Sequence, residues 1–240
     1  MNVYWSPIIM KPVFTGEGMS HLRVPEPTLA SNILKGTFDE NNRSSNFMKC
    51  PSFNKQQKNV YALKFGYTYG FEINKGNVKT EFYDQSFFND TILLRDPKNK
   101  ILSLGRMGYI FISETSLEMD FTGAYLDNND FVNKTTVIPG SFDIGKWFRP
   151  LELSFIIKND PSKIKYSEGD TYAYVNFKTE EKIKLKKFHI TPEINLIIEH
   201  ISSTKNNKLN QVNGLSWFYD LLDKSKYKNK MLKLVKENIL

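Results

Sequence analysis

The residues best suited to chemistry lie in the segment Gly-Lys-Trp-Phe-Arg-Pro at 145–150, between two apolar runs. An arginine stacked on a tryptophan forms a cation–π pair and still offers N–H donors to a carboxylate or phosphate. Trp147 and Arg149 are therefore the first candidates for ligand binding, in a chain with only 3 tryptophans and 5 arginines. The competing interpretation places Trp147 in the core and Arg149 in a surface ion pair. The same candidate pocket takes in three more residues: Arg106, Tyr69 and Glu72.

Metal chemistry is not expected from this sequence. A metal site needs two or three converging ligands, commonly histidines on neighbouring strands. The three histidines, His21, His189 and His200, share no motif, and no His-X-Asp or His-X-Glu pair is present. The single cysteine excludes an internal disulfide and a site built from several thiolates. We therefore predict no metal and no cofactor.

Covalent catalysis has no recognisable machinery either. No Gly-X-Ser-X-Gly elbow is present, and Cys50 precedes Pro51 without a histidine nearby, so we predict a buried structural thiol. Glu118 and Asp120 share one face of a predicted strand, where two carboxylates can tune each other's pKa. We interpret this pair as solvated. Catalytic residues stay unassigned, and an enzyme is the less favoured class.

The composition describes a folded chain with a basic surface. Apolar residues make up 40% and aromatic residues 14% of the 240 residues, enough for a sizeable core. The formal charge is +7, but 28 of the 33 basic residues are lysine, whereas recognition of bases and phosphates in nucleic acids relies on arginine. We expect a solvated lysine face and no nucleic-acid function. No apolar window is long enough to cross a membrane and the opening residues lack a secretory signal, so we expect no transmembrane segment.

Three segments of the chain differ in their periodicity. Residues 1–57 are interrupted by prolines and are predicted to form an irregular N-terminal arm with one short helix at 28–35. Residues 58–190 form the predicted sandwich domain, in which apolar and polar positions alternate in short runs between turn signals. The predicted strands are 59–65, 69–73, 77–83, 91–94, 107–113, 116–122, 131–138, 151–157, 171–177 and 182–190. Residues 191–240 are predicted to be helical and to pack on the sandwich.

Many short strands with tight turns, and no alternation of strand and helix, predict an all-β protein. We expect a two-sheet sandwich of the jelly-roll or double-stranded β-helix (cupin-like) type, with C-terminal α-helices. The lysines at 182, 184 and 186 share one strand face, which we interpret as a solvated edge. The basic helix beyond residue 215 is predicted to dock on the sandwich. Contact with a membrane surface or with a partner helix remains the alternative for it.

Five features, taken in order, resemble an uncharacterised family, a domain of unknown function found in bacteria and in tailed-phage genomes. They are Cys50-Pro51, the strand at 69–73, the turn Pro139-Gly140 before the Trp-Phe-Arg segment, the hairpin at 166–177 and the basic C-terminal helix. The phage members are the more similar ones, and the family supplies no established activity. The turn Glu168-Gly169-Asp170 also resembles cupin-like folds, but the His-X-His of the metal-binding cupins is missing.

Two hypotheses of different class follow. The first is a phage-encoded, non-enzymatic sandwich that acts through protein–protein contacts, as a virion component or a host-directed accessory factor in the host cytoplasm. Protein partners or a homo-oligomer are expected for it. The alternative is a cupin-like small-ligand binder or metal-independent enzyme, with Trp147, Arg149 and Arg106 at the mouth of its pocket.

Overall fold

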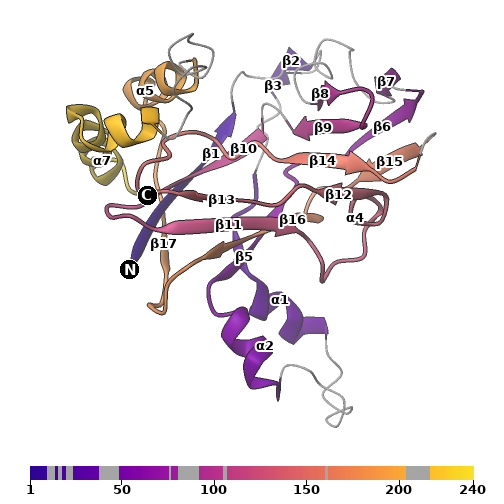
Figure 1. Ribbon diagram of the computed structural model, residues 1–240, viewed down its shortest axis with the longest axis horizontal. Coiled ribbons are helices and arrows are strands. Elements are labelled where there is room, and N and C mark those ends of the chain that lie inside the picture. Colours follow the sequence, from indigo (N-terminus) through magenta and orange to yellow (C-terminus); the bar gives the residue numbers. More distant parts are fainter. Residues whose placement is uncertain are drawn as a thin grey trace.

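The computed structural model describes residues 1–9, 14–15, 18–19, 24–37, 49–75, 77–80, 92–104, 107–159, 162–203 and 217–240. Within these residues the fold is mostly β, and a few short helices lie around the strands (Figure 1). This agrees with the predicted all-β class and is consistent with a sandwich.

The largest sheet is antiparallel and has five strands in the order β13-β11-β16-β5-β4. Their bounds are β13 (Gly140–Asp143), β11 (Glu118–Gly123), β16 (Thr171–Phe177), β5 (Val60–Lys64) and β4 (Thr28–Leu29). Side chains of successive residues point to opposite faces of a strand. Val175 on β16 therefore packs in the main core, while Tyr174 packs in a small cluster on the other face with Ala30, the first residue of α1 (Ala30–Thr37).

Two further sheets contribute to the main core. One has the order β12-β14-β9-β8, with β12 (Thr135–Val137), β14 (Ser154–Ile157), β9 (Ile101–Leu104) and β8 (Ile92–Asp96). The other has the order β15-β6-β7, with β15 (Ser162–Tyr166), β6 (Tyr69–Asn74) and β7 (Asn77–Thr80). A two-stranded ladder joins β2 (Phe14–Thr15) to β3 (Gly18–Met19).

The first residues of the chain form a central strand, which corrects the prediction of an irregular arm there. β1 (Asn2–Ile9) lies between β10 (Met107–Ile112), which it pairs antiparallel, and β17 (Lys184–Lys187), which it pairs parallel. Pro7 had indicated a break, because proline has no N–H to donate. The pairing with β17 covers Asn2 to Trp5 only, so Pro7 lies where β1 has a single neighbour, a position that proline tolerates.

Both faces of the β10-β1-β17 sheet are covered, and each face belongs to a different cluster. Val3 and Trp5 of β1 pack in the main core, whereas Tyr4 and Ile8 pack in a second cluster with the C-terminal helices. The apolar residues of α5 in this cluster are Ile194, Ile197, Ile198 and Ile201. A sheet buried on both faces explains why apolar residues at 3–5 and 8–9 of β1 follow one another without alternating with polar ones.

The helices agree with the predictions at three places and differ at two, α4 (Asp130–Lys134) and α2 (Pro51–Gln56), of which α2 lies in a segment predicted to be irregular. The predicted helix at 28–35 is α1, which begins two residues later, and α5 (Pro192–Ser203) starts at the predicted proline. The tail is helical at 217–223 and in α7 (Lys226–Glu237). The predicted strand at 131–138 is wrong in its first half, which is α4 (Asp130–Lys134). There the Asn129 side chain accepts a hydrogen bond from the Val132 N–H at 3.0 Å and so caps the helix.

Strand prediction missed seven of the described strands and ran past the described residues at two others. β1 to β4 lie in the segment predicted to be irregular, and β9, β13 and β15 were not expected as strands of their own. The end of the predicted strand at 77–83 and the start of the one at 91–94 lie outside the residues that the structure describes, as does most of the predicted polar linker after residue 203. β17 occupies one edge of its sheet, and Lys184 is exposed there, as the solvated-edge interpretation predicted.

Candidate functional site

The predicted corner at 145–150 is a corner, and Asp143 organises it. The Asp143 carboxylate accepts hydrogen bonds from the Leu117 N–H at 2.9 Å, the Gly145 N–H at 2.8 Å and the Ser116 hydroxyl at 2.7 Å. The chain then turns at residues 144–146 and enters the second cluster with Phe148, which is completely buried. Phe148 is therefore the aromatic anchor of the corner, and Trp147 beside it is only partly buried.

The structure brings Trp147 and Arg149 together beneath the helix at 217–223. The Arg149 guanidinium carbon lies 5.0 Å from the centre of the Trp147 ring, and an Arg149 N–H donates to the Tyr219 hydroxyl at 2.9 Å. The Tyr219 ring stacks on Trp147 with ring centres 4.8 Å apart. Arg149 is 6% exposed, so a solvated surface ion pair does not describe it. Burial raises the pKa of Tyr219, and the nearby guanidinium partly offsets that rise.

Tyr219 was not among the predicted site residues. In the tail sequence, Trp217, Phe218, Leu221 and Leu222 recur at helical spacing, and this apolar stripe does not include Tyr219. Tyr219 stands three residues before the buried Leu222, and residues at i and i+3 share a helix face. This spacing of three residues could have predicted from the sequence that Tyr219 faces the protein core.

The other predicted site residues do not join this pair. Tyr69 is completely buried in the main core, and Glu72 is exposed on the same strand, β6. β6 and β7 lie on the opposite side of the molecule from α5 and α7 (Figure 1). Glu72 lines a separate surface hollow of about 350 Å³ with Asn74, Lys75, Asn77 and Lys79. Arg106 lies outside the described residues. The four described candidates therefore belong to three different places.

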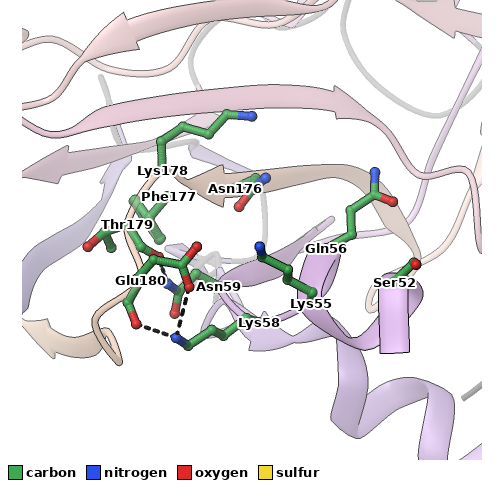
Figure 2. Close-up of a pocket in the computed structure, with 10 residues that line it drawn as sticks. All are labelled: Ser52, Lys55, Gln56, Lys58, Asn59, Asn176, Phe177, Lys178, Thr179 and Glu180. Carbon is green, nitrogen blue, oxygen red and sulfur yellow. Dashed lines mark hydrogen bonds and ion pairs between the residues drawn. The ribbon is translucent and has the colours of Figure 1, made fainter. Parts of the chain in front are cut away.

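A different concave site, which we call the lysine cleft, lies between α2 (Pro51–Gln56) and the end of β16 with the residues that follow it (Figure 2). Its volume is about 650 Å³. Apart from Phe177, its lining residues are polar or charged: Ser52, Lys55, Gln56, Lys58, Asn59, Asn176, Lys178, Thr179 and Glu180. Sequence reasoning missed this site, because Lys178 lies more than 100 residues from Lys55 and Lys58 and the three lysines follow no motif.

Hydrogen bonds and ion pairs hold the wall of the lysine cleft. The Asn59 side chain donates to the Thr179 carbonyl at 2.7 Å and to the Glu181 carbonyl at 2.9 Å, which fixes the turn after β16. The Lys58 ammonium donates to the Glu180 carbonyl, and Lys178 pairs with Asp120 at 2.5 Å. Asp120 is thus held by a lysine and only partly exposed, while Glu118 on the same strand is exposed.

Cys50, at the entrance to α2, is exposed, which corrects the prediction of a buried thiol. The backbone N–H groups of Phe53 and Ser52, in the first turn of α2, lower the pKa of the thiol. These N–H groups have no partner within the helix because they belong to its first turn. The negative thiolate is therefore stabilised more than the neutral thiol.

We expect iodoacetamide to alkylate Cys50 in the folded protein. As the pH is raised, the alkylation rate should increase at a lower pH in the folded protein than in the unfolded chain. The thiolate is the nucleophile, so a lowered pKa moves its formation to lower pH. The rate should be measured against pH with and without urea. An inflection at the same or a higher pH in the folded protein would contradict the lowered pKa.

Exposed large apolar side chains gather on the C-terminal helices. Leu196 of α5 is 52% exposed, and in the helix at 217–223 the values are 43% for Trp217 and 49% for Leu221. Tyr227 at the start of α7 is also exposed. We call these four side chains the apolar strip. Lys224 and Lys226 next to the strip form no ion pair with any described residue, although other lysines of α7 do.

Among the described residues, no group of three or more His, Cys, Asp or Glu side chains is arranged to hold a metal ion. No described helix is long and apolar enough to span a membrane. No protein family, curated protein or solved structure matches this chain.

Proposed function

We propose that this protein acts by binding another protein, without performing a reaction itself. The apolar strip is the observation that carries this proposal. Several exposed large apolar side chains in one region mark an interaction surface more often than single ones do, and four of those in the described residues lie on the C-terminal helices. Trp217 and Leu221 are four residues apart and so lie on one face of their helix, while Tyr219 and Leu222 point into the second cluster.

The partner that fits the apolar strip is a protein segment with apolar residues flanked by carboxylates. Leucine, tryptophan and tyrosine supply apolar area, and Lys224 and Lys226 beside them offer charges that no described carboxylate neutralises. Tryptophan and tyrosine are also the residue types that dominate binding energy at interfaces. A second copy of the chain is the less favoured occupant, because both copies would carry a net charge of +7.

The biological setting that we propose follows from the resemblance to phage members of an uncharacterised family. In that setting the protein is a virion component or a host-directed accessory factor, located in the virion or in the host cytoplasm. Its sandwich is proposed to be of the jelly-roll or double-stranded β-helix type. Antiparallel sheets around one aromatic core support this proposal. Mass spectrometry of purified particles separates the virion component from the accessory factor.

The alternative function, a cupin-like small-ligand binder or metal-independent enzyme, has one observation in its favour. Among the described residues, the buried Trp147 Nε1 and Arg149 Nε atoms have no hydrogen-bond partner, and buried donors normally have one. Tyr69 and Glu72, which were expected to complete that pocket, lie elsewhere. We therefore prefer the protein-binding function.

The test replaces Leu221 by glutamate. A charge in the centre of an apolar contact is expected to weaken partner binding by about tenfold or more, since burying an unpaired charge is costly. A partner is first recovered from cells of the source with the wild-type chain, then purified, and its dissociation constant is measured by calorimetry. Leu94→Glu is the matched control, because Leu94 is an exposed leucine on β8, away from the strip.

Three outcomes decide the proposal. A purified partner that binds wild-type and Leu94→Glu equally well, and Leu221→Glu at least tenfold more weakly, supports it. Equal binding of all three chains overturns it. A dimer in native mass spectrometry that only Leu221→Glu abolishes overturns the assignment to a different protein and makes a second copy the occupant.

A further inference from the structure

We infer that the lysine cleft binds a small soluble molecule that carries two or more phosphate groups. This site is separate from the apolar strip: α2 lies at the far end of the molecule from α5 and α7 (Figure 1). A volume of about 650 Å³ suits a ligand of nucleotide size, since small-molecule sites commonly span about 300–1,000 Å³.

The charge of the cleft favours an anion. Three ammonium groups line it, from Lys55, Lys58 and Lys178. Lys55 forms no ion pair or side-chain hydrogen bond with any described residue, and Figure 2 shows it extending from α2 into the cleft. Lys178 is balanced by Asp120. Glu180 lies 3.4 Å from Lys58, but its side chain is 82% exposed, and an exposed ion pair of this kind is weak.

Two neutral amide side chains, which can donate hydrogen bonds, also line the lysine cleft. The Asn176 side chain lies at the centre of the cleft in Figure 2, and Gln56 lies at its α2 side. Neither side chain makes a hydrogen bond within the described part of the chain, so both amides can donate to an incoming oxygen. The wall opposite them is already fixed by Asn59, which reduces the entropy cost of binding.

Phosphate fits this donor set better than a planar carboxylate does. Lysine acts as a compact point charge without the planar fork of arginine, and several lysines can each meet a different oxygen of a tetrahedral group. Lys55 extends into the cleft from α2, whereas Lys178 follows β16, so their ammonium groups come from two different walls (Figure 2). A second phosphate group on the same ligand would engage the other side. The cleft is bounded by α2 and by the turn at 178–180, which favours a free molecule over a continuous nucleic-acid strand.

The test is titration calorimetry with pyrophosphate at low salt, on the full chain. Lys55→Gln is the main variant, because Lys55 has no ion-pair partner among the described residues and its loss leaves no carboxylate unpaired. We expect the affinity to fall about tenfold or more, the usual cost of losing one charge-assisted hydrogen bond. Lys98→Gln removes one exposed lysine from the β8–β9 turn and serves as the matched control.

Binding of pyrophosphate by wild type and Lys98→Gln with the same affinity, and at least tenfold more weakly by Lys55→Gln, supports the site. An equal loss of pyrophosphate affinity in Lys55→Gln and Lys98→Gln overturns it, because the loss then comes from the lower net charge of the protein and not from the cleft. Absence of pyrophosphate binding by the wild type overturns it as well, and so does binding of a single-stranded oligonucleotide without binding of pyrophosphate. Leu221→Glu should bind pyrophosphate normally, so this test and that of the protein-binding function fail independently.

Discussion

Replacing Phe148 by alanine is expected to lower the free energy of unfolding by about 3–5 kcal/mol, the usual cost of removing a buried phenylalanine ring. Phe148 is completely buried in the second cluster, where the β10-β1-β17 sheet meets the C-terminal helices. The loss combines the apolar area returned to water with the cavity that the ring leaves. Because domains are stable by only about 5–15 kcal/mol, the variant should unfold at a clearly lower urea concentration.

The measurement for Phe148→Ala is urea unfolding followed by circular dichroism. Tyr227→Ala is the control, since Tyr227 is half exposed and its loss should change stability by no more than about 0.5 kcal/mol. A loss below about 1 kcal/mol for Phe148→Ala would show that the corner does not anchor the helices, since a ring buried in a core costs several times more.

Replacing Gly145 by alanine is the second large effect, with an expected loss of about 1–3 kcal/mol. A Cβ atom at residue 145 would lie 2.5 Å from the Thr115 carbonyl oxygen and 2.8 Å from the carbonyl carbon. Both atoms are backbone, so no side-chain rotation relieves the overlap. The corner would have to move away from the 115–116 segment, which also strains the hydrogen bonds that Asp143 accepts from that side.

Gly123→Ala is the matched control for this prediction. A Cβ atom there would meet Val137 at 3.6 Å, an ordinary van der Waals contact, and alanine in a strand is intrinsically more favourable than glycine. Thermal unfolding of both variants should therefore show a lowered midpoint for Gly145→Ala alone. Equal midpoints would show that the corner adjusts without cost.

Much of the fold could be predicted because its signals are local. In the segments that became β6 and β11, apolar and polar residues alternate because the two faces of each strand are buried to different extents, and neighbouring residues alone reveal it. β5 and β16 are buried on both faces, and their aromatic and apolar residues predicted them instead. The stripe of α5 is equally local. The prediction of a strand at 131–138 was wrong in its first half because Asn129 caps one helical turn, and the strand β12 begins only after it. The β-branched residues in this segment are compatible with a helix and with a strand, so residue type did not distinguish the two.

The candidate sites depended on contacts between distant segments. Trp147 and Arg149 were identified as a pair, since they are two residues apart, but the Tyr219 that completes their environment lies 70 residues from Arg149. Tyr69 and Glu72 were grouped with Trp147 and Arg149 on residue type alone. The structure puts both on β6, in the β15-β6-β7 sheet. Residue type does not specify distance in space.

By itself, the sequence determined the β class, the helical C-terminal segment and the corner at 145–150. Each of these features depends on a short stretch of sequence. Within such a stretch, buried side chains recur at the spacing of a strand or of a helix, so the pattern can be recognised without the rest of the chain. Only the tertiary structure placed β1 between β10 and β17, exposed Cys50 and assembled the lysine cleft from Lys55 and Lys178. Such features arise when segments far apart in the sequence come into contact. Strand pairing and packing depend on the shapes of both segments, so neither segment alone carries a periodic sequence pattern that predicts the contact.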